Sequence, residues 1–225
     1  MWPSAVVLSR WLLSNPSVLS QASSVLELGA GCGLSGLLAA CLMKQQQQLS
    51  STRDSDARTT LEQVDKPQLL LSDFNPTVLE NLDRNIAVNE VDDLCQTIGL
   101  DFFQQSGTSH SGWQDMEGHQ QAPVDVVLAA DMICQPADAV CAANTLHDAL
   151  KSGGRAYVVC ADAAHRFGVD HFAQECHRAG LQVQARNVAD LYNDASLAEG
   201  SDMEKTSGFV SGMNLTMFFI EKPNQ

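Results

Sequence analysis

Two hydrophobic periodicities alternate along the chain. Apolar residues recur every three or four positions over 4–14, 34–44, 76–89, 137–150 and 165–179, which predicts amphipathic helices there. Short runs rich in apolar residues lie between them at 24–28, 68–72, 97–100, 124–130, 155–160, 181–186 and 214–221, and they predict strands. We expect Gly153 and Gly154 to end the fourth of these helices. This alternation is typical of an α/β fold in which a doubly wound, mostly parallel sheet carries helices on both faces.

Three polar stretches interrupt the alternation, at 45–66, 104–122 and 189–212. The first opens with four consecutive glutamines and continues with serine, threonine and mixed charge, a composition typical of flexible segments. No linker divides the chain, and 225 residues suit one α/β domain. We therefore expect a single domain over 1–225 with flexible insertions at these three places.

Composition and charge narrow the range of partners. The chain has 27 acidic and 13 basic residues and a formal net charge of −14, which disfavours nucleic acid and would attract a basic protein, although it also serves solubility alone. No apolar stretch is typical of a membrane span or a secretory signal, so we expect no membrane association. The seven cysteines form no CxxC pair, which indicates reduced thiols, no metal centre and a cytoplasmic or nuclear location.

The segment VLELGAGCG, residues 25–33, carries the strongest chemical signal in the chain. A strand that turns through closely spaced glycines lets a ligand approach the backbone, because a Cβ atom would block that approach. Gly31, Gly33 and Gly36 also have the GxGxxG spacing of a dinucleotide-binding loop. The glycines alone therefore allow either a nicotinamide nucleotide or a methyl donor.

Two acidic residues bear on this choice. Glu27 lies at the end of the first predicted strand, where a carboxylate can orient the ammonium group of a ligand and would repel a pyrophosphate. Asp73 ends the second predicted strand, where it can accept hydrogen bonds from both ribose hydroxyls or cap the following helix. A nucleoside that carries an ammonium group and no pyrophosphate fits both positions, which favours S-adenosylmethionine.

Longer segments of the chain resemble a known family. VLELGAGCGLSGLLAA, LSDFNPTVLENLDRNIAVN and VDVVLAADMICQP together resemble the motif series of the class I, seven-strand S-adenosylmethionine-dependent methyltransferases. With WPSAVVLSRWLL at the start, they resemble more narrowly the methyltransferase-like family that contains protein-lysine methyltransferases of calmodulin, chaperones and translation elongation factors. The resemblance implies a Rossmann-like sheet of seven strands with an antiparallel last strand, and S-adenosyl-L-methionine as cofactor.

The resemblance also implies which residues hold the methyl donor. Trp2 would pack near the methionine part of S-adenosylmethionine. Gly29, Ala30 and Gly31 would line the cofactor with their backbone, and Asp73 would hold the ribose.

The resemblance implies roles for further residues, which follow the third predicted strand or end the fourth. Phe102 would cover the adenine, with Trp113 as the rival aromatic residue, and Asp101 would accept a hydrogen bond from the adenine amino group. Ala130 would lie against the cofactor and Asp131 would face the acceptor, as the catalytic residue that positions a lysine amine or takes part in removing its proton.

The acceptor that the resemblance implies is a lysine of a protein substrate, such as a chaperone, a translation factor or another protein with a basic patch. The family commonly has an aromatic residue three positions after the aspartate, whereas this chain has Cys134. That departure keeps two alternatives open. One is a small-molecule N- or O-methyltransferase, and the other is a non-catalytic module that binds the donor or a partner.

Overall fold

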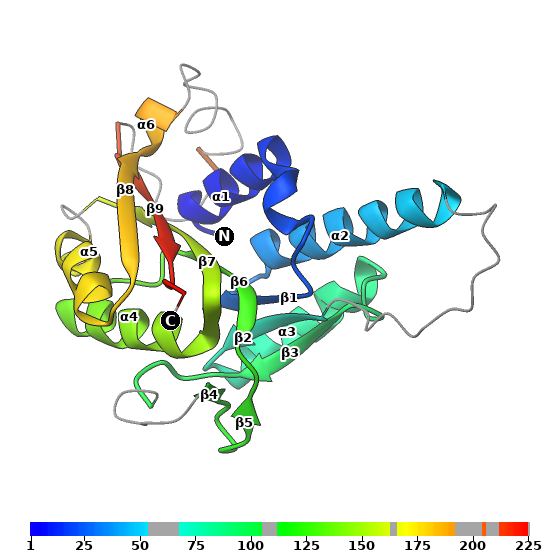
Figure 1. The fold of residues 1–225 in the computed structure, drawn as a ribbon, viewed down its shortest axis with the longest axis horizontal. Helices are drawn as coiled ribbons and strands as arrows, with labels where there is room; N and C mark the ends of the chain where they lie inside the picture. Colours follow the sequence, from blue (N-terminus) through cyan, green and yellow to red (C-terminus); the bar gives the residue numbers. More distant parts are fainter. Residues whose placement is uncertain (54–67, 105–111, 163–165, 192–203, 206–211, 225) are drawn as a thin grey trace.

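The computed structural model describes residues 1–53, 68–104, 112–162, 166–191, 204–205 and 212–224. Their centre is a seven-stranded sheet in the order β3-β2-β1-β6-β7-β9-β8 (Figure 1). The strands are β1 Ser24–Leu28, β2 Gln68–Asp73, β3 Cys95–Gly99, β6 Val124–Ala130, β7 Leu150–Ala161, β8 Gln182–Asn187 and β9 Leu215–Glu221. β9 pairs antiparallel with both β7 and β8, and the other pairings are parallel. The predicted doubly wound sheet with an antiparallel last strand is confirmed.

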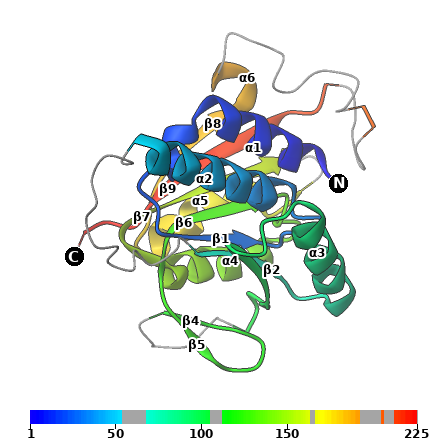
Figure 2. The ribbon, with the colours of Figure 1, turned by 90° about the vertical axis from the view of Figure 1, so that its right-hand side faces the viewer.

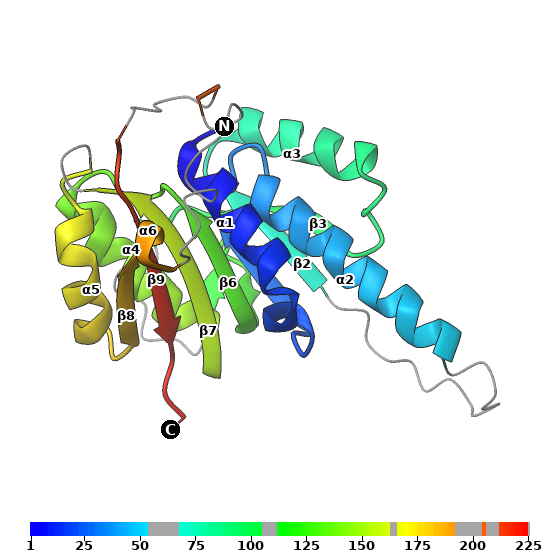
Figure 3. The same cartoon turned by 90° about the horizontal axis from the view of Figure 1, so that it is seen from above.

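Helices cover both faces of the sheet (Figures 2 and 3). One face carries α1 Pro3–Ser14, α2 Leu34–Arg53 and α3 Pro76–Val88, and the other carries α4 Pro136–Ala149 and α5 Val169–Arg178. The short helices η1 Pro16–Leu19 and α6 Val188–Leu191 complete the set. Because neighbouring strand residues point to opposite faces, Leu69 and Leu71 enter the core beneath α1, α2 and α3, whereas Leu70 enters the core beneath α4 and α5.

Two expectations about boundaries were wrong. Gly153 and Gly154 do not end the fourth helix, because α4 stops at Ala149 and both glycines lie inside β7. Gly153 has a φ of +76° and its N–H donates to the Lys222 carbonyl at 2.7 Å, so the glycines belong to an irregular start of the strand. α2 continues to Arg53, beyond the predicted end at residue 44, and its last two turns project past the sheet (Figure 1).

The predicted insertions fall partly on described residues. In the first, 45–53 belong to α2 and 54–67 lie outside the described residues. The second contains a small hairpin of β4 Trp113–Gln114 and β5 Gln120–Gln121, with 105–111 outside the description. α6 opens the region of the third, of which 192–203 and 206–211 are not described.

Neither a membrane-spanning helix nor a cluster of metal ligands occurs among the described residues. No helix in this part of the chain is long and apolar enough to span a membrane. Nor do His, Cys, Asp or Glu side chains within it form a group of three that could hold a metal ion.

Candidate active site

The glycine turn after β1 lies at the carboxyl edge of three neighbouring parallel strands, β2, β1 and β6. Gly29, Gly31 and Gly33 adopt φ values of +60°, +56° and +78°, a left-handed conformation that L side chains rarely take. A Cβ atom at Gly31 would meet no atom within 4 Å, whereas one at Gly33 would lie 2.7 Å from Leu82 Cδ2. Gly31 therefore leaves its backbone open to a ligand, and Gly33 serves the packing beneath the turn.

Asp73 joins the end of β2 to this turn. Its Oδ2 accepts a hydrogen bond from the Gly31 N–H at 3.2 Å, and its Oδ1 accepts one from the Asn75 N–H at 3.0 Å. The N-cap of α3 is Asn75, whose side chain accepts from the Thr77 N–H, so the alternative role of Asp73 as helix cap does not hold. Asp73 is 8% exposed, and its contact with a ribose stays a prediction.

Glu27 lies at the end of β1, as expected, but its side chain is buried. Its side chain is 2% exposed and points toward the first turn of α2, where Oε2 accepts a hydrogen bond from the Gly36 N–H at 3.0 Å. The reason is strand alternation: Glu27 lies on the same face of β1 as Val25, beneath α2. Burial raises the pKa of Glu27 to about 8, against the opposing effect of the Gly36 hydrogen bond. Glu27 thus fixes α2 to β1, and direct contact with a ligand's ammonium group does not follow from its place.

Gly36 completes this arrangement. A Cβ atom there would lie 2.2 Å from Leu71 Cδ2 and 2.5 Å from Glu27 Oε2. Gly36 is the third glycine of the GxGxxG spacing. The close approach of α2 to the sheet requires a glycine there, and this packing accounts for it without a phosphate.

The segment after β3 brings the predicted adenine residues next to Asp73, since the Leu100 N–H donates to the Asp73 carbonyl at 3.0 Å. Phe102 is half-buried, and its ring stacks on that of Phe103 with a centroid distance of 5.1 Å. Asp101 Oδ1 accepts from the Phe103 N–H at 2.9 Å. Trp113 is fully buried and its Nε1 donates to the Ala122 carbonyl at 3.1 Å, so Phe102 is the better placed of the two rival aromatic residues.

Phe74 is a candidate that the sequence reasoning missed. It follows Asp73 directly, is 63% exposed, and borders a hollow of about 540 Å³ together with Ile98, Gly99 and Met116. An exposed aromatic ring beside the carboxylate that is predicted to hold the ribose suits the face of an adenine. The signal was present in the sequence as the aromatic residue of the DFNP segment.

Asp131 lies at the end of β6, next to the half-buried Ala130. Its φ of +57° is unusual for a residue other than glycine, and such strained backbone conformations concentrate at functional sites. The following residue approaches the glycine turn, because a Cβ atom at Gly29 would lie 3.6 Å from Met132 Cβ. The predicted acceptor residue and the predicted donor turn are therefore neighbours.

Arg166 binds Asp131 through two contacts. Arg166 Nη2 lies 2.9 Å from Asp131 Oδ2 and Nε lies 3.2 Å from Oδ1. The guanidinium also lies over the ring of Trp2, 5.2 Å from its centroid, which brings the predicted Trp2 to the same corner. The hydrogen bond to Asp131 raises the pKa of Arg166. No sequence pattern pointed to Arg166, which is 35 positions from its partner.

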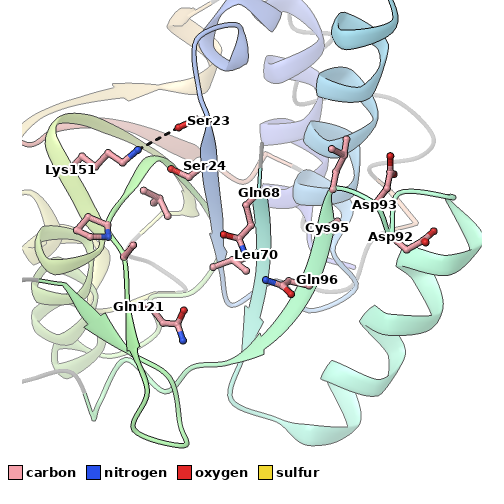
Figure 4. Close-up of a pocket in the computed structure, with 14 residues that line it drawn as sticks. Ser23, Ser24, Gln68, Leu70, Asp92, Asp93, Cys95, Gln96, Gln121 and Lys151 are labelled. Atoms are coloured by element: carbon pink, nitrogen blue, oxygen red, sulfur yellow. Dashed lines mark hydrogen bonds between the residues drawn. The ribbon is translucent and has the colours of Figure 1, made fainter. Parts of the chain in front are cut away.

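A second hollow, of about 630 Å³, opens at the opposite edge of the sheet (Figure 4). Ser23, Ser24, Gln68 and Lys151 line it, at the amino ends of β1 and β2 and the start of β7. Lys151 Nζ lies 2.7 Å from Asp125 Oδ1, and Asp125 Oδ2 accepts from both serines. Because this hollow lies at the amino ends of β1 and β2, it is separate from the candidate active site at the carboxyl ends of the same strands.

Comparison with known proteins identifies the family to which this chain belongs. The family model described as lysine methyltransferase matches residues 1–176. The chain belongs to this lysine methyltransferase family. No curated protein matches the sequence. This methyltransferase is similar in fold to geranyl diphosphate methyltransferase, solved in complex with SAM, with a TM-score of 0.60 and 11% identity over 96% of this chain and 85% of the other.

Two further solved structures show how far the fold extends. A TehB-like SAM-dependent methyltransferase from Corynebacterium glutamicum matches with a TM-score of 0.51 and 15% identity, covering 95% of this chain and 94% of the other. The cyclase SpnF matches with a TM-score of 0.52 and 13% identity, covering 90% and 76%. The fold is thus shared with an enzyme of another reaction class, and the family match is what identifies a methyltransferase.

S-adenosylmethionine is the methyl donor of this methyltransferase. The described residues fit it at two points. Gly31 presents open backbone that a side chain would cover, and the Asp73 carboxylate lies beside it at the carboxyl edge of the sheet. This edge is where open α/β sheets bind nucleoside ligands.

Proposed function

We propose that the protein transfers the methyl group of S-adenosylmethionine to a lysine side chain of a protein substrate. The observation that carries the proposal is the carboxylate of Asp131, held at a strained strand end beside the glycine turn in a chain of the lysine methyltransferase family. An anionic group at this place suits an acceptor that arrives as a cation.

The donor end of the site would be held mainly by backbone. Gly29, Ala30 and Gly31 would line the amino-acid part of the donor, and Asp73 would accept hydrogen bonds from the ribose. Bound S-adenosylmethionine supplies a methyl group on a positively charged sulfur, which a nucleophile in line with the bond can take.

Aromatic and small side chains would complete that end. Phe102 and Phe74 would cover the adenine, Asp101 would accept from its amino group, and Ala130 and Trp2 would pack against the rest of the donor. The protein then raises the rate of methyl transfer by aligning donor and acceptor and by excluding water.

The acceptor amine has to be neutral when it attacks. Asp131 would hold the arriving ammonium and orient the amine after it has lost its proton, and it stays the candidate that takes part in this loss. The formal net charge of −14 supports a substrate with a basic patch, such as a chaperone or a translation factor. A cytoplasmic or nuclear location belongs to the same proposal.

The test is to incubate the protein with labelled S-adenosylmethionine and a cell lysate, and then to map the modified residue by mass spectrometry. Label on a lysine of one protein is expected. Asp73→Ala is expected to abolish labelling, whereas Asp83→Ala, an exposed carboxylate that contacts Thr97 at 2.7 Å, serves as the matched control. Label confined to small molecules would overturn the lysine assignment.

One observation favours a second candidate, a small-molecule N- or O-methyltransferase. Cys134 is exposed at the position where the resembling family has an aromatic residue, so a lysine channel would lack that wall. Label recovered in the metabolite fraction of the same lysate would support this candidate. Donor binding without label in either fraction would point to a non-catalytic binding module.

A further inference from the structure

A cation-binding corner lies between Trp2 at the start of α1 and Asp131 at the end of β6. It combines the face of an indole ring with a carboxylate, the two groups that together bind ammonium and guanidinium ions best. The cation in this corner is the chain's own Arg166, 2.9 Å from Asp131 Oδ2 and 5.2 Å from the centre of the Trp2 ring.

The accessibility of these groups conflicts with a free acceptor residue. The side chain of Asp131 is only 3% exposed and that of Arg166 is 20% exposed, so Arg166 is the more exposed partner of the pair. Both carboxylate oxygens contact Arg166, and Oδ1 also lies 3.4 Å from the Ala161 N–H. An incoming lysine cannot reach Asp131 while Arg166 keeps both contacts.

We propose that Arg166 is an internal competitor that occupies the acceptor's cation-binding position, and that a basic side chain of the acceptor binds by displacing it. This inference rests on the proposed function, because it takes Asp131 as the residue that meets the acceptor. It adds to that function a regulatory role for Arg166: an acceptor binds in the corner when its cation displaces the guanidinium.

Displacement suits the corner for two further reasons. Trp2 is 46% exposed, so this residue lies at the surface, where a second chain can reach it. The strained backbone of Asp131 is fixed by its N–H, which donates to the Val159 carbonyl at 2.8 Å, and that bond does not involve Arg166. The carboxylate therefore keeps its backbone support when the guanidinium leaves.

The experiment measures cation binding without donor and without methyl transfer. The probe is n-butylammonium chloride, which has the stem and charge of a lysine side chain, titrated at constant ionic strength. Its binding is followed by the fluorescence of Trp2, because Trp11 and Trp113 are 5% and 0% exposed. Loss of the signal in a Trp2→Phe background assigns it to this ring.

Arg166→Ala is expected to bind n-butylammonium at least about tenfold more tightly than the unchanged protein, because the competing cation is gone. Arg178→Ala is the matched control, since Arg178 belongs to α5 and pairs with Glu175 away from the corner. Arg166→Gln gives the same test with a longer neutral side chain if the alanine variant does not fold. Adding Asp131→Asn to either variant is expected to remove the gain.

Three results would overturn the inference. They are an affinity of the folded Arg166 variants within about twofold of the unchanged protein, an equal gain for neutral n-butanol, or a gain that survives Asp131→Asn. Absence of methyl transfer leaves this assay unaffected, so a failure of the proposed function and a failure of the inference are distinguishable.

Discussion

Replacing Glu27 with glutamine is expected to make the fold more resistant to alkaline pH. The buried carboxyl accepts a hydrogen bond from the Gly36 N–H, and burial raises its pKa from 4.5 to about 8. Between these two values the folded protein holds a proton on Glu27 that the unfolded chain has released. The free energy of unfolding contributed by this group is therefore fully present below pH 4.5 and is lost as the pH rises to about 8.

The size of the effect follows from the same shift. Each pH unit in the window lowers the free energy of unfolding by about 1.4 kcal/mol, and the whole window amounts to on the order of 4 to 5 kcal/mol. Glutamine has nearly the same shape, can accept the Gly36 hydrogen bond, and carries no charge at any of these pH values. The difference in unfolding free energy between the variant and the unchanged protein should grow in favour of the variant from pH 5 to pH 8.

Urea unfolding at pH 5, 6, 7, 8 and 9, followed by circular dichroism, measures this difference. Glu80→Gln is the control, because Glu80 is an exposed acid of α3 whose contact with Arg84 is 3.8 Å long. Parallel pH profiles for the Glu27→Gln variant and the unchanged protein would show that Glu27 is not a buried neutral acid. The account of how α2 is fixed to β1 would then be wrong.

Further substitutions test the glycine turn and its surroundings. Gly31→Ala should cost about 1–2 kcal/mol of stability for its left-handed φ, and should weaken S-adenosylmethionine binding at least about tenfold by calorimetry. Gly33→Ala should lower the free energy of unfolding, measured with urea, by about 1–3 kcal/mol more than Gly31→Ala does, because the added Cβ would meet Leu82 at 2.7 Å. Phe74→Ala should weaken donor binding about three- to tenfold and change stability by less than about 0.5 kcal/mol, since the ring is 63% exposed. Asp125→Asn should lower the unfolding free energy by about 1–3 kcal/mol at pH 7. Although burial acts to raise the pKa of Asp125, hydrogen bonds from Lys151, Ser23 and Ser24 lower it to about 2, so this contribution should vanish as the pH falls from 3.8 to 2.

The parts of the fold that sequence could predict depend on local patterns. β1 begins and ends where the apolar run does, and α3 begins at Pro76 as its missing N–H allows. Hydrophobic periodicity ends near residue 44, yet α2 continues to Arg53 through glutamines, which favour helix without any apolar face. Gly153 and Gly154 lie in a strand because pairing with a distant segment overrode the local stop signal.

The direction of a side chain was harder to predict than its position. Glu27 and Asp73 both lie at strand ends, as expected, but only Asp73 reaches the glycine turn. Both side chains project from the same face of the sheet, but Glu27 pairs with Leu71 inside the sheet beneath α2, whereas Asp73 lies two residues further along β2, at the carboxyl edge beside the turn. The sequence analysis assigned the adenine to Phe102 with Trp113 as its rival, and the burial of the indole favours Phe102.

The two ends of the site differ in how they are built, and this difference explains what sequence could predict of each. The proposed donor end consists of backbone from consecutive residues, 29–33, with one carboxylate from the neighbouring strand. The acceptor corner consists of side chains from the start of α1, the end of β6 and the segment before α5, which only the fold brings together. Changes at the corner are therefore expected to alter the choice of acceptor while the glycine turn keeps its geometry, because the contacts of Arg166 with Asp131 and Trp2 do not involve the turn itself.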